Sequence, residues 1–374
     1  MRIGITCYPT YGGSGAVATE LGIALAERGH EVHFITYQQP FRLRTFRPGI
    51  YFHEVNVGRY PLFEYPPYDL ALAVRMHEVV RSHGLELLHL HYAIPHATSA
   101  WIAREMLRRT GEDVRLITTL HGTDITIVGQ DPSFHAITKF SIEQSDRLTA
   151  VSEYLRRETY SAFGCTACAV DVIPNFVDPS VYDRGRYPRT IPGITDGGRP
   201  VLAHVSNFRP VKRVTDVVRI FARVHASQPC TLLMVGDGPE RDAAEAEARR
   251  LGVERDVQFL GKLDAVAPLL ATARVFLLPS ETESFGLSAL EALACGVPVV
   301  ASRTGGLAEV VRDGETGVLA PVADVDAMAE AALTLVRDES RWTAMSRAAA
   351  ADARARFSRE TIVGRYEALY RGMV

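Results

Sequence analysis

Two glutamates with seven residues between them, Glu283 and Glu291, stand across the point where a predicted strand at 275–281 gives way to a predicted helix over 286–296. Ligands of open α/β sheets bind outside the carboxyl ends of the strands, which is where Glu283 falls. Ionised carboxylates only accept hydrogen bonds, so both residues suit the neighbouring hydroxyls of a ribose or another sugar. Taken alone, the pair is equally well explained by an acid that favours the helix dipole and a solvated glutamate on the helix surface.

The residues that follow Glu283 begin the predicted helix. The first N–H groups of a helix have no partner within it and can face a phosphate. We therefore expect the backbone there to contact an anionic ligand, through Ser284, Phe285, Gly286 and Leu287.

A basic turn, SNFRPVKR at 206–213, follows the apolar stretch 201–205 in the same half of the chain. Lysine occurs only at positions 139, 212 and 262, so Lys212 stands out among basic residues that are mostly arginine. The planar fork of Arg209 can hold two phosphate oxygens, and Lys212 would add a point charge. Cations aimed at a departing phosphate stabilise the transition state more than the ground state. The alternative is a basic turn on the surface.

Two stretches in the first half of the chain carry further candidates. His121, in HGTD, directly follows the apolar stretch RLITTL, and the glycine loop at 12–15 opens a predicted helix. Glycine there allows a ligand to approach the backbone closely. The positions 13, 15 and 18 satisfy the dinucleotide pattern G-x-G-x-x-A, but the second strand ends TYQQ at 36–39, without the acid that would bind a ribose. A nicotinamide-dependent oxidoreductase is therefore a remote alternative. Gly236, in GDGP, is a weaker candidate, since turn chemistry also explains it.

Short apolar stretches alternate with helical patterns through both halves of the chain, which predicts two α/β domains, each a doubly wound parallel sheet of the Rossmann-like kind. A chain of 374 residues is also too long for one ordinary core. The segment 184–199, rich in Gly, Pro and Arg, is the expected linker. We expect an N-terminal domain over 1–183, a C-terminal domain over 200–357 and a final helix over 358–374. The two domains are expected to face each other across a cleft.

Composition narrows the classes of partner. A formal net charge of -3 gives no global positive field for nucleic acid. No run of about 18 apolar residues is present, and five cysteines suit a reducing compartment, so we expect a cytoplasmic protein. Cys165 and Cys168 form a lone C-x-x-C without further metal ligands nearby, for which we expect a structural or incidental role. The acids at 324 and 326 predict a helix N-cap rather than a metal site. The sequence leaves assembly into a homo-oligomer open.

The motifs together resemble the retaining GT-B glycosyltransferases of family 4, over nearly the whole chain. The resemblance rests on Glu283 to Glu291, on ACGVPVVAS and GGLAE after them, and on SNFRPVKR. It implies that Arg209 and Lys212 hold the donor's diphosphate, Glu291 its ribose and Glu283 the hydroxyls of its sugar. It also implies that the C-terminal helix returns to the first domain. The expected catalytic residues are His121, Arg209, Lys212 and Glu283. The expected donor-binding residues are Gly13, Ser14, Gly15, Asn207, Gly236, Ser284, Phe285, Gly286, Leu287 and Glu291.

Stretches of the first half, including GITCYPTYGGSGAVATELG, HLHYAIPHA and TLHGTDIT, are similar to the branch of this family that serves bacillithiol biosynthesis. That branch moves N-acetylglucosamine from UDP-N-acetylglucosamine to the hydroxyl of L-malate, without a metal or other cofactor. The acceptor-binding residues expected for malate are Ser14, Tyr92, Thr119, His121 and Asn175, with Arg42 as a looser candidate. A sister enzyme acting on inositol phosphate or a lipid-linked polyol is the alternative. Arg42, Arg44 and Arg47, among aromatic residues, are the feature that would suit a membrane, which the sequence otherwise does not favour.

Overall fold

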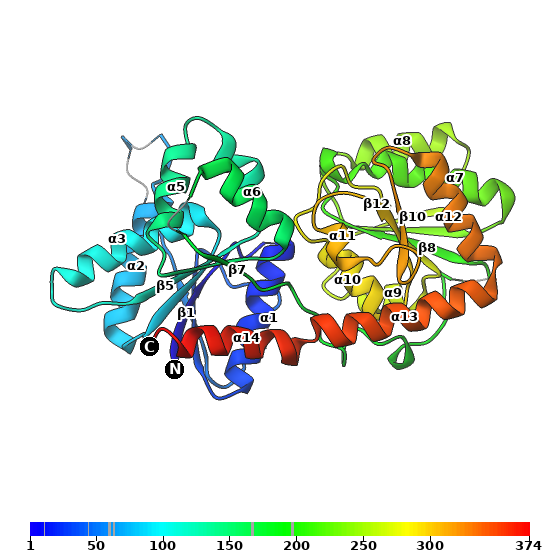
Figure 1. The fold of residues 1–374 in the computed structure, drawn as a ribbon. Coiled ribbons are helices and arrows are strands. Elements are labelled where there is room, and N and C mark those ends of the chain that lie inside the picture. Colours follow the sequence, from blue (N-terminus) through cyan, green and yellow to red (C-terminus); the bar gives the residue numbers. More distant parts are fainter. Residues whose placement is uncertain (11, 44, 59–60, 63, 166–167, 196–197) are drawn as a thin grey trace. The chain divides into compact units, whose positions relative to one another are not determined.

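The computed structural model describes residues 1–10, 12–43, 45–58, 61–62, 64–165, 168–195 and 198–374 (Figure 1). The chain divides into two compact units, one formed by Met1–Pro174 with Ile362–Val374 and the other by Asn175–Thr361. The segment 184–199, expected as a linker, lies within the second unit, and the division falls nine residues before the expected end of the first domain at 183. Hydrogen bonds explain this placement, because Arg184 donates to the backbone carbonyls of Cys295 and Ala273 in the second unit.

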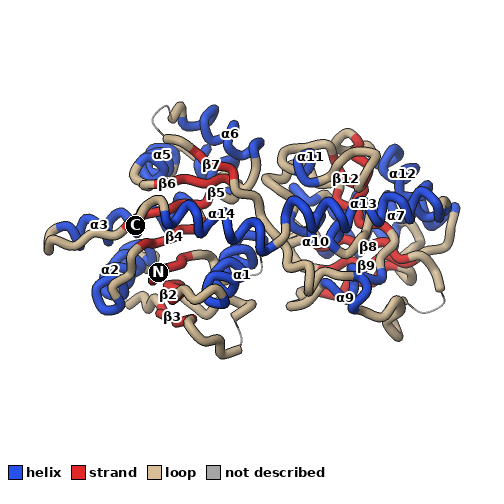
Figure 2. Tube along the Cα trace, turned by 60° about the horizontal axis from the view of Figure 1, so that its bottom comes forward, coloured by secondary structure: helices blue, strands red, loops and turns tan. Residues whose placement is uncertain are grey.

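The first unit is built on a seven-stranded parallel sheet with the order β3-β2-β1-β4-β5-β6-β7. Figure 2 shows β3 at one edge of this sheet. The strands are β1 (Arg2–Thr6), β2 (Glu31–Thr36), β3 (Ile50–Glu54), β4 (Leu87–His91), β5 (Arg115–Leu120), β6 (Arg147–Ala150) and β7 (Val170–Val172). The helical segments are α1 (Gly13–Glu27), α2 (Tyr68–His83), η1 (Ala93–Ala97), α3 (Thr98–Arg108), α4 (Thr123–Thr126), η2 (Val128–Gln130), α5 (His135–Glu143) and α6 (Glu153–Phe163).

The second unit is built on a six-stranded parallel sheet with the order β10-β9-β8-β11-β12-β13. Its strands are β8 (Val201–Val205), β9 (Thr231–Val235), β10 (Val257–Gly261), β11 (Val275–Leu278), β12 (Val299–Ser302) and β13 (Gly317–Ala320). Its helical segments are η3 (Arg184–Arg186), η4 (Pro210–Lys212), α7 (Val214–Ser227), α8 (Arg241–Arg250), α9 (Ala267–Thr272), α10 (Leu287–Ala294), α11 (Leu307–Val310), α12 (Val325–Arg337) and α13 (Glu339–Phe357). The last helix, α14 (Arg359–Arg371), begins in the second unit and lies mostly in the first.

Both sheets follow from the apolar runs of the sequence. The central strands β4, β9, β11 and β12 are buried along their whole length, which is the pattern of parallel strands covered on both faces. The predicted α/β class with two doubly wound parallel sheets is therefore confirmed. The expected cap at Asp324 is also confirmed, because its Oδ1 accepts from the Ala327 N–H at 3.0 Å where α12 begins.

The C-terminal residues are held to the first unit by side chains of α14. Glu367 accepts from Arg28 Nη1 at 2.7 Å and pairs with His30 Nε2 at 2.8 Å. The Tyr370 hydroxyl lies 2.7 Å from His89 Nδ1 within the buried sheet. A helix far away in sequence thus completes the core of the first unit.

Within the described residues, no helix combines the length and the apolar character needed to cross a bilayer. In the arginine-rich segment, Arg42 pairs with Glu20 at 3.2 Å and Arg47 with Glu27 at 3.3 Å. Arg44 lies outside the described residues.

Candidate active site

The loops after β8 and β11 bring Lys212 and Glu283 together. Lys212 Nζ lies 2.6 Å from Glu283 Oε1, and the Ser280 hydroxyl donates to the same oxygen at 2.9 Å. Glu283 is buried and Lys212 mostly so. The sequence places these residues 71 positions apart, and the sheet unites them because β8 and β11 are neighbours. The result is a cation and a carboxylate at the carboxyl edge of the second sheet, where an incoming ligand can exchange partners with them.

Backbone hydrogen bonds fix these loops against each other. The Glu281 N–H donates to the Val211 carbonyl at 2.8 Å, and the Gly306 N–H donates to the Glu283 carbonyl at 2.8 Å. A Cβ added at Gly306 would stand 2.2 Å from the Ser284 carbonyl oxygen. Gly306 in GGLAE is therefore required where its backbone passes close to that of Glu283 and Ser284.

The turn that leads into α10 directly follows Glu283 in the chain. Gly286 adopts φ +95°, which only glycine takes without strain, and directly precedes Leu287 at the helix start. The Phe285 ring is buried and meets the Phe357 ring edge-on at 5.7 Å. Phe285 thus anchors the turn through its side chain, so that only its backbone is available for the predicted donor contact.

The basic turn after β8 packs closely against the loop after β9. A Cβ at Gly236, which has φ +126°, would lie 1.8 Å from the Ser206 carbonyl oxygen. Asn207 Oδ1 is buried and has no hydrogen-bond partner among the described residues. Arg209 is exposed. The predicted residues Asn207, Arg209 and Gly236 therefore lie around one loop crossing, next to Lys212.

Glu291 is buried on α10 and accepts a hydrogen bond from the Tyr182 hydroxyl at 2.6 Å. Sequence reasoning missed Tyr182, which precedes Glu291 by 109 positions and belongs to no motif that we recognised. One oxygen of the carboxylate is thus oriented by the protein itself. A ribose that binds here would meet a carboxylate of fixed orientation.

His204, on β8, is a second residue that sequence reasoning missed. Its Nδ1 lies 2.8 Å from the Leu277 carbonyl oxygen and its Nε2 lies 2.7 Å from the Ser206 hydroxyl. Burial lowers the pKa of His204 to about 4, and the nearby Lys212 lowers it further, against the hydrogen bond to Leu277. A neutral imidazole therefore links the end of β8 to β11 and holds the turn that carries Lys212.

In the first unit, the ends of β1, β4 and β5 bring together several predicted residues. A Cβ at Gly15 would stand 2.3 Å from the Tyr8 carbonyl oxygen, so the start of α1 packs tightly on the loop after β1. The Tyr8 ring meets the Tyr92 ring edge-on at 5.2 Å, and Tyr92 lies 5.4 Å from the His121 ring. Gly15, Tyr92 and His121 are therefore linked through Tyr8, and Ser14 precedes Gly15 in the first turn of α1. The close approach at Gly15 is to the chain's own backbone.

His121 belongs to a group of histidines held in the neutral form. Its Nε2 lies 2.8 Å from His91 Nδ1. Burial lowers the pKa of His121 to about 3, assisted by His96, and burial also lowers the pKa of His91 well below its usual range. The Nε2 atoms of His91 and His96 are buried without a hydrogen-bond partner in the described part of the chain. At neutral pH these histidine rings are uncharged donors and acceptors.

Asp124, in the HGTD motif, orients the loop that bears His121. Its carboxylate accepts from the N–H groups of Ala93 at 3.1 Å, Gly122 at 3.0 Å and His121 at 3.4 Å. Burial raises the pKa of Asp124 to about 6, against the effect of these hydrogen bonds. The motif thus supplies both a side chain facing Tyr92 and the buried acid that positions it.

Two further predicted acceptor residues, Thr119 and Asn175, are buried. Thr119 is fully buried, and its hydroxyl lies 2.7 Å from both His89 Nε2 and the Thr149 hydroxyl, so it is engaged inside the sheet. Asn175 is buried and is the first residue of the second unit.

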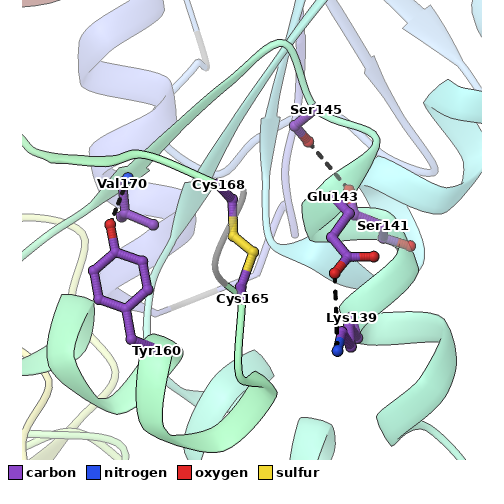
Figure 3. The surroundings of a disulfide bond; sticks show 8 residues. All are labelled: Lys139, Ser141, Glu143, Ser145, Tyr160, Cys165, Cys168 and Val170. Atoms are coloured by element: carbon purple, nitrogen blue, oxygen red, sulfur yellow. Dashed lines mark hydrogen bonds and ion pairs between the residues drawn. A yellow bond between two sulfur atoms is a disulfide. The ribbon is translucent and has the colours of Figure 1, made fainter.

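A disulfide joins Cys165 and Cys168 between α6 and β7 (Figure 3). Tyr160, on α6, accepts a hydrogen bond from the Val170 N–H at 3.0 Å beside it. Both contacts tie the end of α6 to the start of β7, which is a structural role.

Comparisons with known proteins find matches over both units of the chain. The family described as "Glycosyltransferase Family 4" matches residues 11–181, and the family described as "Glycosyl transferases group 1" matches residues 192–352. The chain is 48% identical over 373 residues to N-acetyl-alpha-D-glucosaminyl L-malate synthase of Bacillus anthracis, covering 99% of this chain and 96% of that protein. It is 30% identical over 371 residues to D-inositol 3-phosphate glycosyltransferase of Kribbella flavida, covering 90% of this chain and 85% of that protein.

Solved structures share the fold. Anabaena Alr3699/HepE, in complex with UDP and glucose, superimposes with a TM-score of 0.81 at 21% identity over 99% of each chain. Sucrose-phosphate synthase from Thermosynechococcus elongatus superimposes with a TM-score of 0.79 at 23% identity, over 99% of this chain and 98% of that one. With two doubly wound units and close sequence relatives over its full length, this chain belongs to the family 4 glycosyltransferases and has the GT-B fold.

Proposed function

We propose that this enzyme transfers N-acetylglucosamine from UDP-N-acetylglucosamine to the hydroxyl of L-malate, with retention of the anomeric configuration. The observation that carries the proposal is 48% identity, over 99% of the chain, to a relative named as the synthase of that product. Because the match includes both units, it supports the acceptor as well as the donor.

The donor side of the proposal uses the charged residues of the second unit. Lys212 would leave Glu283 to meet the β-phosphate, and Arg209 would add its guanidinium to the diphosphate. The negative charge on the diphosphate grows as the bond to the sugar breaks, so both cations act most strongly in the transition state. Glu283, once released from Lys212, could accept hydrogen bonds from the hydroxyls of the sugar, and Glu291 from the ribose.

The acceptor side uses the neutral cluster of the first unit. Ser14, Tyr92 and His121 would receive malate and direct its hydroxyl to the anomeric carbon. The C1–O bond to UDP breaks and the C1–O bond to malate forms on the same face of the sugar, while the hydroxyl proton passes to a β-phosphate oxygen. The products are UDP and the α-glycoside of malate. A trapped covalent adduct between sugar and enzyme would refute this route.

The direct test measures UDP release from UDP-N-acetylglucosamine with L-malate, with D-malate and without acceptor. We expect release to depend on L-malate, and the product's anomeric proton to report the α configuration by NMR. Release at the same rate without malate would contradict the proposed acceptor.

Inositol phosphate is the second candidate acceptor, because a relative at 30% identity over 90% of the chain is named for it. The same assay with 1D-myo-inositol 3-phosphate separates the two. Faster transfer to the inositol phosphate than to malate would reassign the acceptor while leaving the donor side of the proposal intact.

A further inference from the structure

Three histidines gather at one edge of the first sheet. His33 lies on β2, His53 on the edge strand β3 and His83 at the last position of α2, and one ring nitrogen from each falls within 4.8 Å of the others. His33 and His53 are 20 positions apart and His53 and His83 are 30 apart, so they do not form a short metal-binding sequence motif. The strand register explains the meeting, because His33 pairs with Tyr51 and His53 lies two residues further on the same face of β3.

The hydrogen bonds of His33 prepare one of its nitrogens as a ligand. Its Nε2 lies 2.9 Å from Glu31 Oε1, and its Nδ1 lies 2.8 Å from His53 Nε2. When Nε2–H donates to Glu31, the Nδ1 lone pair points at His53. A carboxylate that holds the far N–H of a histidine is the usual support of metal-bound imidazole.

We propose that His33, His53 and His83 bind a divalent transition metal of the zinc class, with Glu31 orienting His33 and with water completing the coordination. Imidazole is a preferred ligand of such metals, and three protein ligands with an open fourth position is a common arrangement. Tetrahedral zinc bonds of about 2.0–2.1 Å separate two ligand nitrogens by about 3.3 Å. The metal would therefore replace the proton between His33 and His53 and widen their contact slightly, while the His83 ring draws inward.

The exposure of the three histidines determines from which side a metal can reach them. His33 is fully buried, His53 partly buried and His83 exposed, so a metal can enter from the His83 side.

The site would be structural. His83 ends α2 at the side of the sheet where β4 begins, whereas Ser14, Tyr92 and His121, proposed for transfer, follow the carboxyl ends of β1, β4 and β5. A bound metal would join the C-terminal end of α2 to an edge strand that pairs on one side only.

The test uses the full-length chain, freed of metal with a chelator and titrated with Zn²⁺ in a calorimeter. We expect one equivalent to bind and the thermal midpoint to rise. His53→Ala and His83→Ala should each weaken binding at least tenfold, and Glu31→Gln on the order of 10–100-fold, as for other outer-shell carboxylates. Circular dichroism of each metal-free variant would show that it is folded.

Two controls make the outcome decisive. His77→Ala removes another histidine of α2 and should leave the affinity unchanged. Cys165→Ser with Cys168→Ser should also leave it unchanged, which excludes thiolate ligation. Absence of stoichiometric binding, equal binding by His53→Ala and the parent chain, or binding lost only in the cysteine variant would each overturn the proposal.

Discussion

In the second unit, the strand ends carry charge, with Lys212 against Glu283 at 2.6 Å and Arg209 exposed beside them. In the first unit, the corresponding strand ends carry neutral groups, with His121 against His91 and Tyr92. Both arise from the same kind of parallel sheet, yet in our proposal one meets a leaving group that gains charge and the other an incoming hydroxyl. The fold therefore determines where a site lies, while the side chains at the strand ends determine its electrostatics.

The largest expected effect tests the neutral side. His121→Ala should lower kcat on the order of 10³-fold, because it removes a positioned polar group and leaves His91 Nδ1 without its partner. UDP binding, measured by calorimetry, should stay within about twofold, because the contacts proposed for the diphosphate and the ribose belong to the second unit. An equal loss of UDP affinity would contradict the division of roles between the units.

Lys212→Ala tests the charged side. We expect kcat to fall on the order of 10²-fold, with a smaller change in the KM for the donor, because the lost charge acts mainly on the departing diphosphate. Steady-state kinetics with varied UDP-N-acetylglucosamine measures both. Lys262→Ala removes an exposed lysine of the same unit and should behave as the parent enzyme. A change confined to KM would indicate uniform donor binding instead.

Acid should destabilise the first unit before the second. Burial lowers the pKa of His89 to about 3 and that of His96 to about 4, with an ordinary value near 6.5 in the unfolded chain. The neutral forms therefore stabilise the fold above about pH 6.5, and this stability is lost as pH falls toward the folded pKa values, by about 2 kcal/mol for each residue at pH 5. The raised pKa of Asp124 has the opposite sign and offsets about 1 kcal/mol.

Amide hydrogen exchange at pH 7 and pH 5 measures this difference. Protection of β4 and β5 should fall more than that of β8 and β9, since His204 is the corresponding buried histidine of the second unit. Earlier loss of protection in β8 and β9 would show that another group controls acid stability.

The smallest effect concerns the orientation of Glu291. Glu291→Gln should raise the donor's KM about tenfold, since a neutral amide accepts more weakly from the ribose. Tyr182→Phe should raise it only a few-fold, because it removes a single supporting hydrogen bond of about 1 kcal/mol. Initial rates at varied donor concentration measure both. A larger effect of Tyr182→Phe than of Glu291→Gln would place the tyrosine itself against the donor.

The candidate residues at strand ends could be found in the sequence because their positions follow from local order. An apolar strand, a glycine turn and an amphipathic helix place Glu283 or His121 at the carboxyl edge of a parallel sheet wherever they occur. Contacts between residues that are distant in the sequence could not be predicted from local order. Tyr182 reaches Glu291 across 109 positions and His89 reaches Tyr370 across 281, and neither distance leaves a periodic signal.

The amino-acid order was sufficient for the alternation of strands and helices and for the family to which the chain belongs. Only the tertiary structure decided that Lys212 rests on Glu283, that Thr119 turns inward, that the segment 184–199 joins the second unit and that three histidines meet beside β3. The physical reason is that periodicity and turn chemistry act over a few residues. Strand order and register, in contrast, are settled by packing among segments that are distant along the chain.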